Sequence, residues 1–142
     1  MRFKLHEAKD SIMLNFADLS CKEVHAGHLC AATFAADKVT LQDMKTGSML
    51  LTYYDARKAG TLSKEDENLI KTKQISFPHV TELNTWHTLS VTIAGDTMTA
   101  SVDGEKVGSF SSPGIAHESK QILRLLVPHQ VTIDDVKYYR KK

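Results

Sequence analysis

Histidine is the residue type with the most chemical potential in this chain, because seven occur in 142 residues. His25 and His28 have a spacing at which two imidazoles could hold one metal ion, with Cys21 or Cys30 as a further ligand. A structural zinc site needs four ligands at recognisable spacing, and the sequence contains neither Cys-x-x-Cys nor His-Glu-x-x-His. We therefore expect no metal site, no cofactor, and histidines that act singly as hydrogen-bonding groups.

The acidic residues do not form an evident catalytic pair, since glycoside hydrolysis requires two carboxyl groups that face each other across a groove. Asp96 and Asp103 fall in predicted turns, and residues 65–67 fall at the start of a predicted helix. Asp134 and Asp135 remain, on a predicted final strand where one of them has to face inward or sit in a bulge. An inward carboxylate needs a partner, so we interpret it as structural. No nucleophile elbow and no glycine-rich phosphate loop occurs.

Sugar binding needs less than catalysis: an aromatic platform and a few polar groups. Residues 53–57, Tyr-Tyr-Asp-Ala-Arg, leave a predicted strand and enter a loop before the helix, which makes Tyr54 and Arg57 candidates. Trp86 is the only tryptophan, and we assign it to the core. The predicted ligand-binding residues, which depend on convergence in one groove, are His28, Tyr54, Arg57, His117 and Asp135.

Alternation of apolar and polar residues with a period of two is the dominant structural signal. It predicts strands at 3–5, 12–16, 29–34, 39–42, 89–93, 98–102, 121–127 and 130–139. Gly95-Asp96 and Asp103-Gly104 lie between alternating runs and are typical of tight hairpins. Residues 86–111 are therefore predicted to form a three-stranded meander, within a single all-β domain over 1–142 that is an antiparallel sandwich.

One segment departs from the alternation and predicts a single short helix over 63–73. Ser63 is a good N-cap, acids follow it, and lysines lie in the last turn, which suits the helix dipole at both ends. We expect Leu69 and Ile70 to pack inward.

The final strand contains a change of phase. Its apolar residues shift from Val131 and Ile133 to Val136 and Tyr138, which reverses the face they occupy. A bulge or twist at Asp134-Asp135 would absorb the shift.

Several motifs of the second half carry a resemblance to a known family. Trp86-His87-Thr88-Leu89-Ser90-Val91 is followed by Gly95-Asp96, then Ser101 to Gly108, and finally Val131-Thr132-Ile133-Asp134-Asp135-Val136. This order resembles the concanavalin A-like lectin/glucanase sandwiches, and more narrowly the bacterial proteins around the 3-keto-disaccharide hydrolase family. The segments 27–30 and 114–117 are similar to uncharacterised relatives of that family. The resemblance implies a jelly-roll-like sandwich.

The resemblance and the missing catalytic constellation lead to three functional expectations. The first is a non-catalytic carbohydrate-binding or accessory module acting on glycans. The second is a glycoside-active enzyme that uses His28, His117 or Asp135 in a groove. The third is a structural or self-assembly module whose exposed sheet binds another protein or itself. The glucanase pattern Glu-x-Asp-x-x-Glu is absent, which argues against ordinary glucanase activity.

The net charge and the first residues of the chain limit the classes of partner that we expect. A net charge of +1 gives no field to attract nucleic acid or an anionic membrane, so we expect neither as a partner. No apolar run approaches the ~20 residues of a membrane helix, and no signal peptide is recognisable, so the chain as given is expected in the cytoplasm. The chain begins inside a predicted strand, residues 3–5; the sandwich is short there, or a longer precursor places it in the periplasm or outside the cell. Unpaired edges at such a start predict a homodimer.

Overall fold

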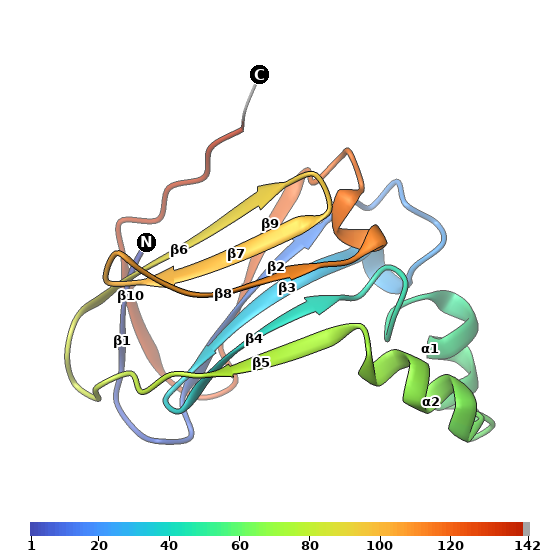
Figure 1. Ribbon diagram of the computed structural model, residues 1–142, viewed down its shortest axis with the longest axis horizontal. Helices are drawn as coiled ribbons and strands as arrows, with labels where there is room; N and C mark the ends of the chain where they lie inside the picture. The colour runs from blue at the N-terminus through green and yellow to red at the C-terminus, as the bar shows by residue number, and fades with distance from the viewer. Residues whose placement is uncertain (141–142) are drawn as a thin grey trace.

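The computed structural model describes residues 1–140, which form two antiparallel five-stranded sheets packed face to face (Figure 1). The β6 sheet has the strand order β10-β1-β6-β7-β8, and the β3 sheet has the order β5-β4-β3-β2-β9. In the β6 sheet the bounds are β1 Arg2–Leu5, β6 His87–Ala94, β7 Thr97–Val102, β8 Glu105–Ser111 and β10 Val131–Asp134. In the β3 sheet they are β2 Ser11–Ala17, β3 His28–Ala35, β4 Lys38–Asp43, β5 Gln74–Pro78 and β9 Ile122–Leu126. The predicted all-β sandwich is confirmed.

The period-two alternation corresponds to the core face of each sheet, as predicted. Along β2 the side chains of Ile12, Leu14 and Phe16 point into the core, and they lie opposite Phe34, Ala32 and Cys30 of β3. The β6 sheet supplies the facing layer, with these residues buried: Phe3, Leu5, Leu89, Met98, Ala100 and Val102. Cys30 is completely buried and free, so its thiol packs as a small apolar side chain.

The predicted meander over 86–111 is confirmed as β6, β7 and β8. Asp103 and Gly104, which join β7 to β8, have φ angles of +53° and +81°. A type I′ turn requires positive φ at both central residues, and its twist matches that of the flanking strands. The turn therefore fixes the register of the hairpin.

The two sheets approach closely where Phe77 of β5 lies on Gly108 of β8. A Cβ atom at Gly108 would be 2.5 Å from the Phe77 ring, so only glycine leaves room for it. This contact closes one long side of the sandwich.

The helices differ in part from the prediction. Helix α2, Lys64–Lys71, begins as expected at Ser63, whose Oγ accepts a hydrogen bond from the Asp66 amide at 3.1 Å. Leu69 does not pack inward, since 42% of it is exposed. The prediction of one helix was wrong, because residues 51–58 form a second one, α1 Leu51–Lys58. Leu50 precedes α1 without a side-chain cap, so the usual start signal is missing.

Two further expectations differ from the structure. The final strand is shorter than the predicted 130–139, because β10 ends at Asp134 and Asp135, at the position predicted for a bulge or twist, adopts a left-handed φ of +54° and leaves the sheet; both aspartates are exposed, so neither faces inward. Trp86 is not a core residue. It precedes β6 at the surface, 36% exposed, with the Arg2 guanidinium 4.5 Å and the Lys4 ammonium 4.8 Å from its ring. The Trp86 ring is therefore held by cation–π contacts with Arg2 and Lys4 and not by burial in the core.

Candidate functional site

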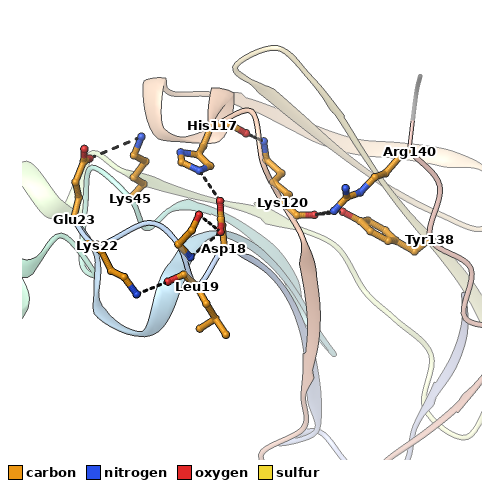
Figure 2. A network of polar contacts seen from close by, with 10 residues as sticks. Asp18, Leu19, Lys22, Glu23, Lys45, His117, Lys120, Tyr138 and Arg140 are labelled. Carbon is orange, nitrogen blue, oxygen red and sulfur yellow. Dashed lines mark hydrogen bonds and ion pairs between the residues drawn. The ribbon is translucent and has the colours of Figure 1, made fainter.

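An aspartate–histidine pair lies at one end of the sandwich (Figure 2). Asp18 directly follows β2, and His117 follows the 3₁₀ turn η2, Pro113–Ala116. Nε2 of His117 lies 3.2 Å from Oδ2 of Asp18. Residues 99 positions apart thus meet because the end of β2 and the η2 turn are at the same end of the fold.

Asp18 is built to remain ionised. Only 2% of the residue is exposed, yet its Oδ1 accepts hydrogen bonds from the Ser20 amide at 2.8 Å and the Ser20 hydroxyl at 2.6 Å. These bonds, with further help from His117 and Ser119, lower the pKa of the Asp18 carboxyl from 3.8 to about 2 despite the opposing effect of burial. The carboxylate therefore fixes the orientation of the His117 ring by accepting its Nε2–H.

The other ring nitrogen of His117 faces no hydrogen-bonding partner among the described residues. Within residues 1–140, Nδ1 of His117 makes no hydrogen bond, and the histidine lines an open depression of about 500 Å³. Among the described residues the lining consists of Lys45, Pro113, Ala116, His117, Glu118 and Ser119. Lys45 reaches from the β4 side, with its ammonium 4.0 Å from the Glu23 carboxylate (Figure 2). The depression combines donors, acceptors and a small apolar surface.

Lys120 connects this end of the sandwich to the C-terminal segment. Its ammonium donates to the His117 carbonyl, and its own carbonyl accepts hydrogen bonds from the Tyr138 hydroxyl at 2.8 Å and the Arg140 guanidinium at 2.6 Å (Figure 2). Burial lowers the pKa of the Lys120 ammonium. The amine is engaged with backbone, so it holds His117 in place.

The nearby thiol is chemically quiet. Burial raises the pKa of Cys30 to about 12. A nucleophilic cysteine acts as the thiolate, which Cys30 does not form at neutral pH. Among the described residues no group of three or more His, Cys, Asp or Glu side chains is arranged to hold a metal ion.

The η2 turn that carries His117 is itself clamped by Asp43 at the end of β4. Oδ2 of this buried carboxyl accepts hydrogen bonds from the Ser112 hydroxyl at 2.5 Å and the Gly114 amide at 2.9 Å. Thr46 adds its amide to Oδ1 at 3.0 Å and its hydroxyl to Oδ2 at 2.5 Å. The Asp43 clamp thus joins the β3 sheet to the segment that leaves β8.

Three of the predicted binding residues belong to a different cluster, on the outer face of the β3 sheet. His28 Nδ1 lies 2.9 Å from Oδ1 of the buried Asn15. The rings of His25 and Tyr54 stack with centroids 3.9 Å apart, and Arg57 covers Tyr54 with its guanidinium carbon 5.6 Å from the ring centroid. His25 also lies beside His28, with centroids 6.3 Å apart.

This stack attaches helix α1 to the His25 segment of the same chain. Tyr54 has His25 on one side and is also contacted by Arg57, so its ring contributes to attaching α1. Arg57 further donates to the Ser48 carbonyl at 3.0 Å. Burial, and then the charges of Arg124 and His25, lower the pKa of His28. The cluster is explained by packing of α1 and the 18–27 loop on the sheet.

The five predicted binding residues do not meet in one groove. Asp135 is exposed just beyond β10 of the opposite sheet, where its carboxylate pairs with Lys137 at 3.2 Å. His28 contacts Asn15 on the outer face of the β3 sheet, and His117 contacts Asp18 at the end of the sandwich. Only His117 of the predicted set lines the depression.

Sequence reasoning missed Asp18, Lys45, Glu118 and Ser119. The Asp18-Leu19-Ser20 stretch carried a usable signal, since an aspartate two residues before a serine favours a side-chain turn. Nothing local indicates that Asp18 faces His117. That contact depends on the strand order.

Comparison with known proteins adds no assignment: no family model, no curated protein and no solved structure matches the chain. Among the described residues no helix is long and apolar enough to cross a membrane. The chemistry of the site therefore has to be argued from its geometry.

Proposed function

We propose that this protein is a non-catalytic carbohydrate-binding module whose ligand occupies the depression beside His117. The observation that supports this most is the imidazole itself, held by the ionised Asp18 with Nδ1 directed to no protein group of residues 1–140. Sugar hydroxyls both donate and accept, so they match a surface that offers Lys45 as a donor and Glu118 as an acceptor. Pro113 and Ala116 can contact the apolar face of a sugar ring.

We expect binding without hydrolysis because the site does not offer the pair of carboxyl groups that hydrolysis requires. Hydrolysis needs one protonated and one ionised carboxyl group on opposite sides of the scissile bond. Asp18 is occupied by Ser20 and His117 and stays ionised behind the depression, and among residues 1–140 Glu118 is the one acid that lines the depression. Within residues 1–140 no contact joins His28, His117 and Asp135, so nothing in the geometry supports an enzyme that combines them in one groove.

A glycan array followed by calorimetric titration of the bound saccharides tests the proposal. We expect His117→Ala to weaken binding about tenfold, since loss of one ligand hydrogen bond costs about 1.4 kcal/mol. Lys45→Ala should weaken binding by a comparable factor. His28→Ala is the matched control, because His28 belongs to the separate stack with His25. Absence of any saccharide binding by the folded protein, or equal losses in H117A and H28A, would refute the proposal.

A further inference from the structure

His87, the first residue of β6, has a hydrogen-bond acceptor at each nitrogen of its ring. Nδ1 lies 2.7 Å from Oδ2 of Asp103, in the turn between β7 and β8. Nε2 lies 2.9 Å from the main-chain carbonyl oxygen of Glu82, in the loop of residues 79–86 between β5 and β6. Only 10% of the His87 side chain is exposed. The ring therefore joins the 79–86 loop to the β7–β8 turn.

The chemistry of these two partners decides the protonation state of the ring. A carbonyl oxygen and an ionised carboxylate can only accept hydrogen bonds. The hydrogen bonds from His87 and from the Thr88 amide, which lies 2.9 Å from Oδ1, lower the pKa of the Asp103 carboxyl and keep it ionised. A neutral imidazole has a single N–H and satisfies only one of the two acceptors. Both contacts are hydrogen bonds only when the ring carries two N–H groups and a positive charge.

The surroundings of His87 favour this cationic form. Burial opposes it, but the hydrogen bonds to Asp103 and to the Glu82 carbonyl, together with the negative charges of both residues, raise the pKa of His87 above 6.5. Among the described residues, two acids thus act on the ring, and each belongs to one of the two segments that the ring joins.

The cations near this site are directed elsewhere. His79, in the same loop, acts on the charge of Asp103. Strand β1 presents the uncharged Phe3 to the His87 ring, with the ring centroids 5.8 Å apart. The two cationic side chains of β1 lie over the Trp86 ring instead: Arg2 and Lys4.

Loss of one proton from the ring breaks one of the two contacts, and the loop contact is the weaker one. A hydrogen bond to a carboxylate is shorter and stronger than one to a neutral carbonyl, and the distances of 2.7 and 2.9 Å follow this order. The neutral ring therefore keeps its N–H at Nδ1, and the lone pair of Nε2 faces the Glu82 carbonyl oxygen. The loop then depends on its main-chain hydrogen bonds, from Thr81 to Ala36 and from Asn84 to Leu5.

We propose that His87 is a pH-sensitive switch, which holds the 79–86 loop as an imidazolium and loosens it as the neutral ring. Because the folded-state pKa of His87 is raised, the attachment is complete below pH 6.5 and is lost as the pH rises through the folded-state value. The pKa of Asp103 is lowered, so its contribution is complete above pH 3.8 and is lost as the pH falls through its own folded-state value.

The switch is independent of saccharide binding beside His117. Strand β8 begins after the Asp103 turn and ends before η2, so His87 and His117 lie at opposite ends of the sandwich (Figure 1). The loop that His87 holds covers its own end of the core through Leu83, which packs against the buried residues. Loosening it should therefore change the stability of that end alone.

Nuclear magnetic resonance of the full chain labelled with ¹⁵N and ¹³C, titrated from below pH 6.5 to about pH 9, tests the proposal. We expect both ring nitrogens of His87 to be protonated at the start and Nδ1 alone at the end. The ¹³C shift of the Glu82 carbonyl should follow the same midpoint. The protection factors of the Thr81 and Asn84 amides should fall about fivefold across it, as expected for the loss of one hydrogen bond. Those of the β3 strand should not change.

Two variants separate the switch from other effects of pH. Asp103→Asn removes the carboxylate but keeps the turn, since asparagine also tolerates the φ of +53°. The midpoint of His87 should fall by about one pH unit or more. His6→Gln is the matched control, because Nε2 of His6 lies 2.7 Å from the Thr132 hydroxyl, which can donate or accept and so satisfies either form of the ring. H6Q should leave the titration of His87 and of the loop unchanged.

Any of three results would overturn the proposal. The first is a His87 ring with a single N–H below pH 6.5, since the two contacts would then not both be hydrogen bonds. The second is a Glu82 carbonyl shift, or protection of the Thr81 and Asn84 amides, that does not change at the midpoint of His87. The third is an unchanged midpoint in folded D103N.

Discussion

Removal of the Asp43 clamp should destabilise the fold by an amount that can be worked from its hydrogen bonds. Asp43→Ala removes the acceptor of two buried donors, the Ser112 hydroxyl and the Gly114 amide, and also that of the half-buried Thr46 amide and hydroxyl. A buried donor without a partner costs about 1–3 kcal/mol. The expected loss in free energy of unfolding is therefore about 4 kcal/mol, a large part of the stability of a small domain.

Asp43→Asn separates the hydrogen bonds from the shape of the side chain. One oxygen of the amide still accepts, so only one of the two backbone N–H groups loses its partner. The expected loss is about 2 kcal/mol. Gly114→Ala attacks the same clamp from the opposite side, because a Cβ atom there would lie 2.0 Å from Oδ1 of Asp43. Since both changes disrupt one contact, the double variant should lose less than the sum of the single losses.

Urea unfolding followed by the fluorescence of the single tryptophan, Trp86, measures these differences. Asp37→Asn is the matched control, since this exposed aspartate lies in the turn between β3 and β4 and makes no side-chain hydrogen bond to residues 1–140. A D43A loss below about 1 kcal/mol, or D43N and D37N of equal stability, would show that the clamp does not join the two parts of the fold.

The remaining predictions concern the sheet contact, the site aspartate and the assembly. Gly108→Ala should destabilise the protein by about 1–3 kcal/mol by overpacking, and Phe77→Leu should restore part of the loss in the double variant; an unchanged urea midpoint would contradict the Phe77 contact. The folded-state pKa of Asp18 lies below its ordinary value, so its contribution to stability is complete above pH 3.8 and is lost as the pH falls toward about 2. Asp18→Asn should flatten the pH dependence of the free energy of unfolding in this window, and an unchanged slope would be the contrary result. The homodimer expected from unpaired edges predicts a doubled mass by sedimentation at micromolar concentration, and a monomeric mass would exclude it.

The sequence predicted those parts of the fold that depend on local pattern. Alternation predicted eight of the ten strands, and the Asp103-Gly104 turn predicted a ninth, β8. The strand β5 at 74–78 was missed, because only Ile75 and Phe77 carry its alternation before Pro78. Asp103-Gly104 gave the hairpin because the turn requires positive φ. Helix α2 was found through its caps, whereas α1 has no side-chain cap and is held by the Tyr54 and His25 stack.

The candidate site was predicted less well because it depends on long-range contacts. His117 was identified as a residue type that suits binding, but its partner Asp18 is 99 positions away and its support from Asp43 crosses from β4 to η2. The polar residues His28 and Tyr54 were equally suggestive in the sequence, and the fold uses them to attach a helix. Residue type alone does not show which histidine lines a depression; the strand order decides this, because it places His117 at the end of the sandwich and His28 against Asn15.

The position of His117 also links the stability of the fold to binding. His117 follows η2, and η2 is held by Asp43 through the Gly114 amide, so loosening the clamp should change the ring position that Asp18 maintains. D43N should therefore weaken a ligand bound at His117, whereas the control D37N should leave its affinity unchanged. An unchanged affinity in folded D43N would mean that the Asp43 clamp does not set the position of the His117 ring.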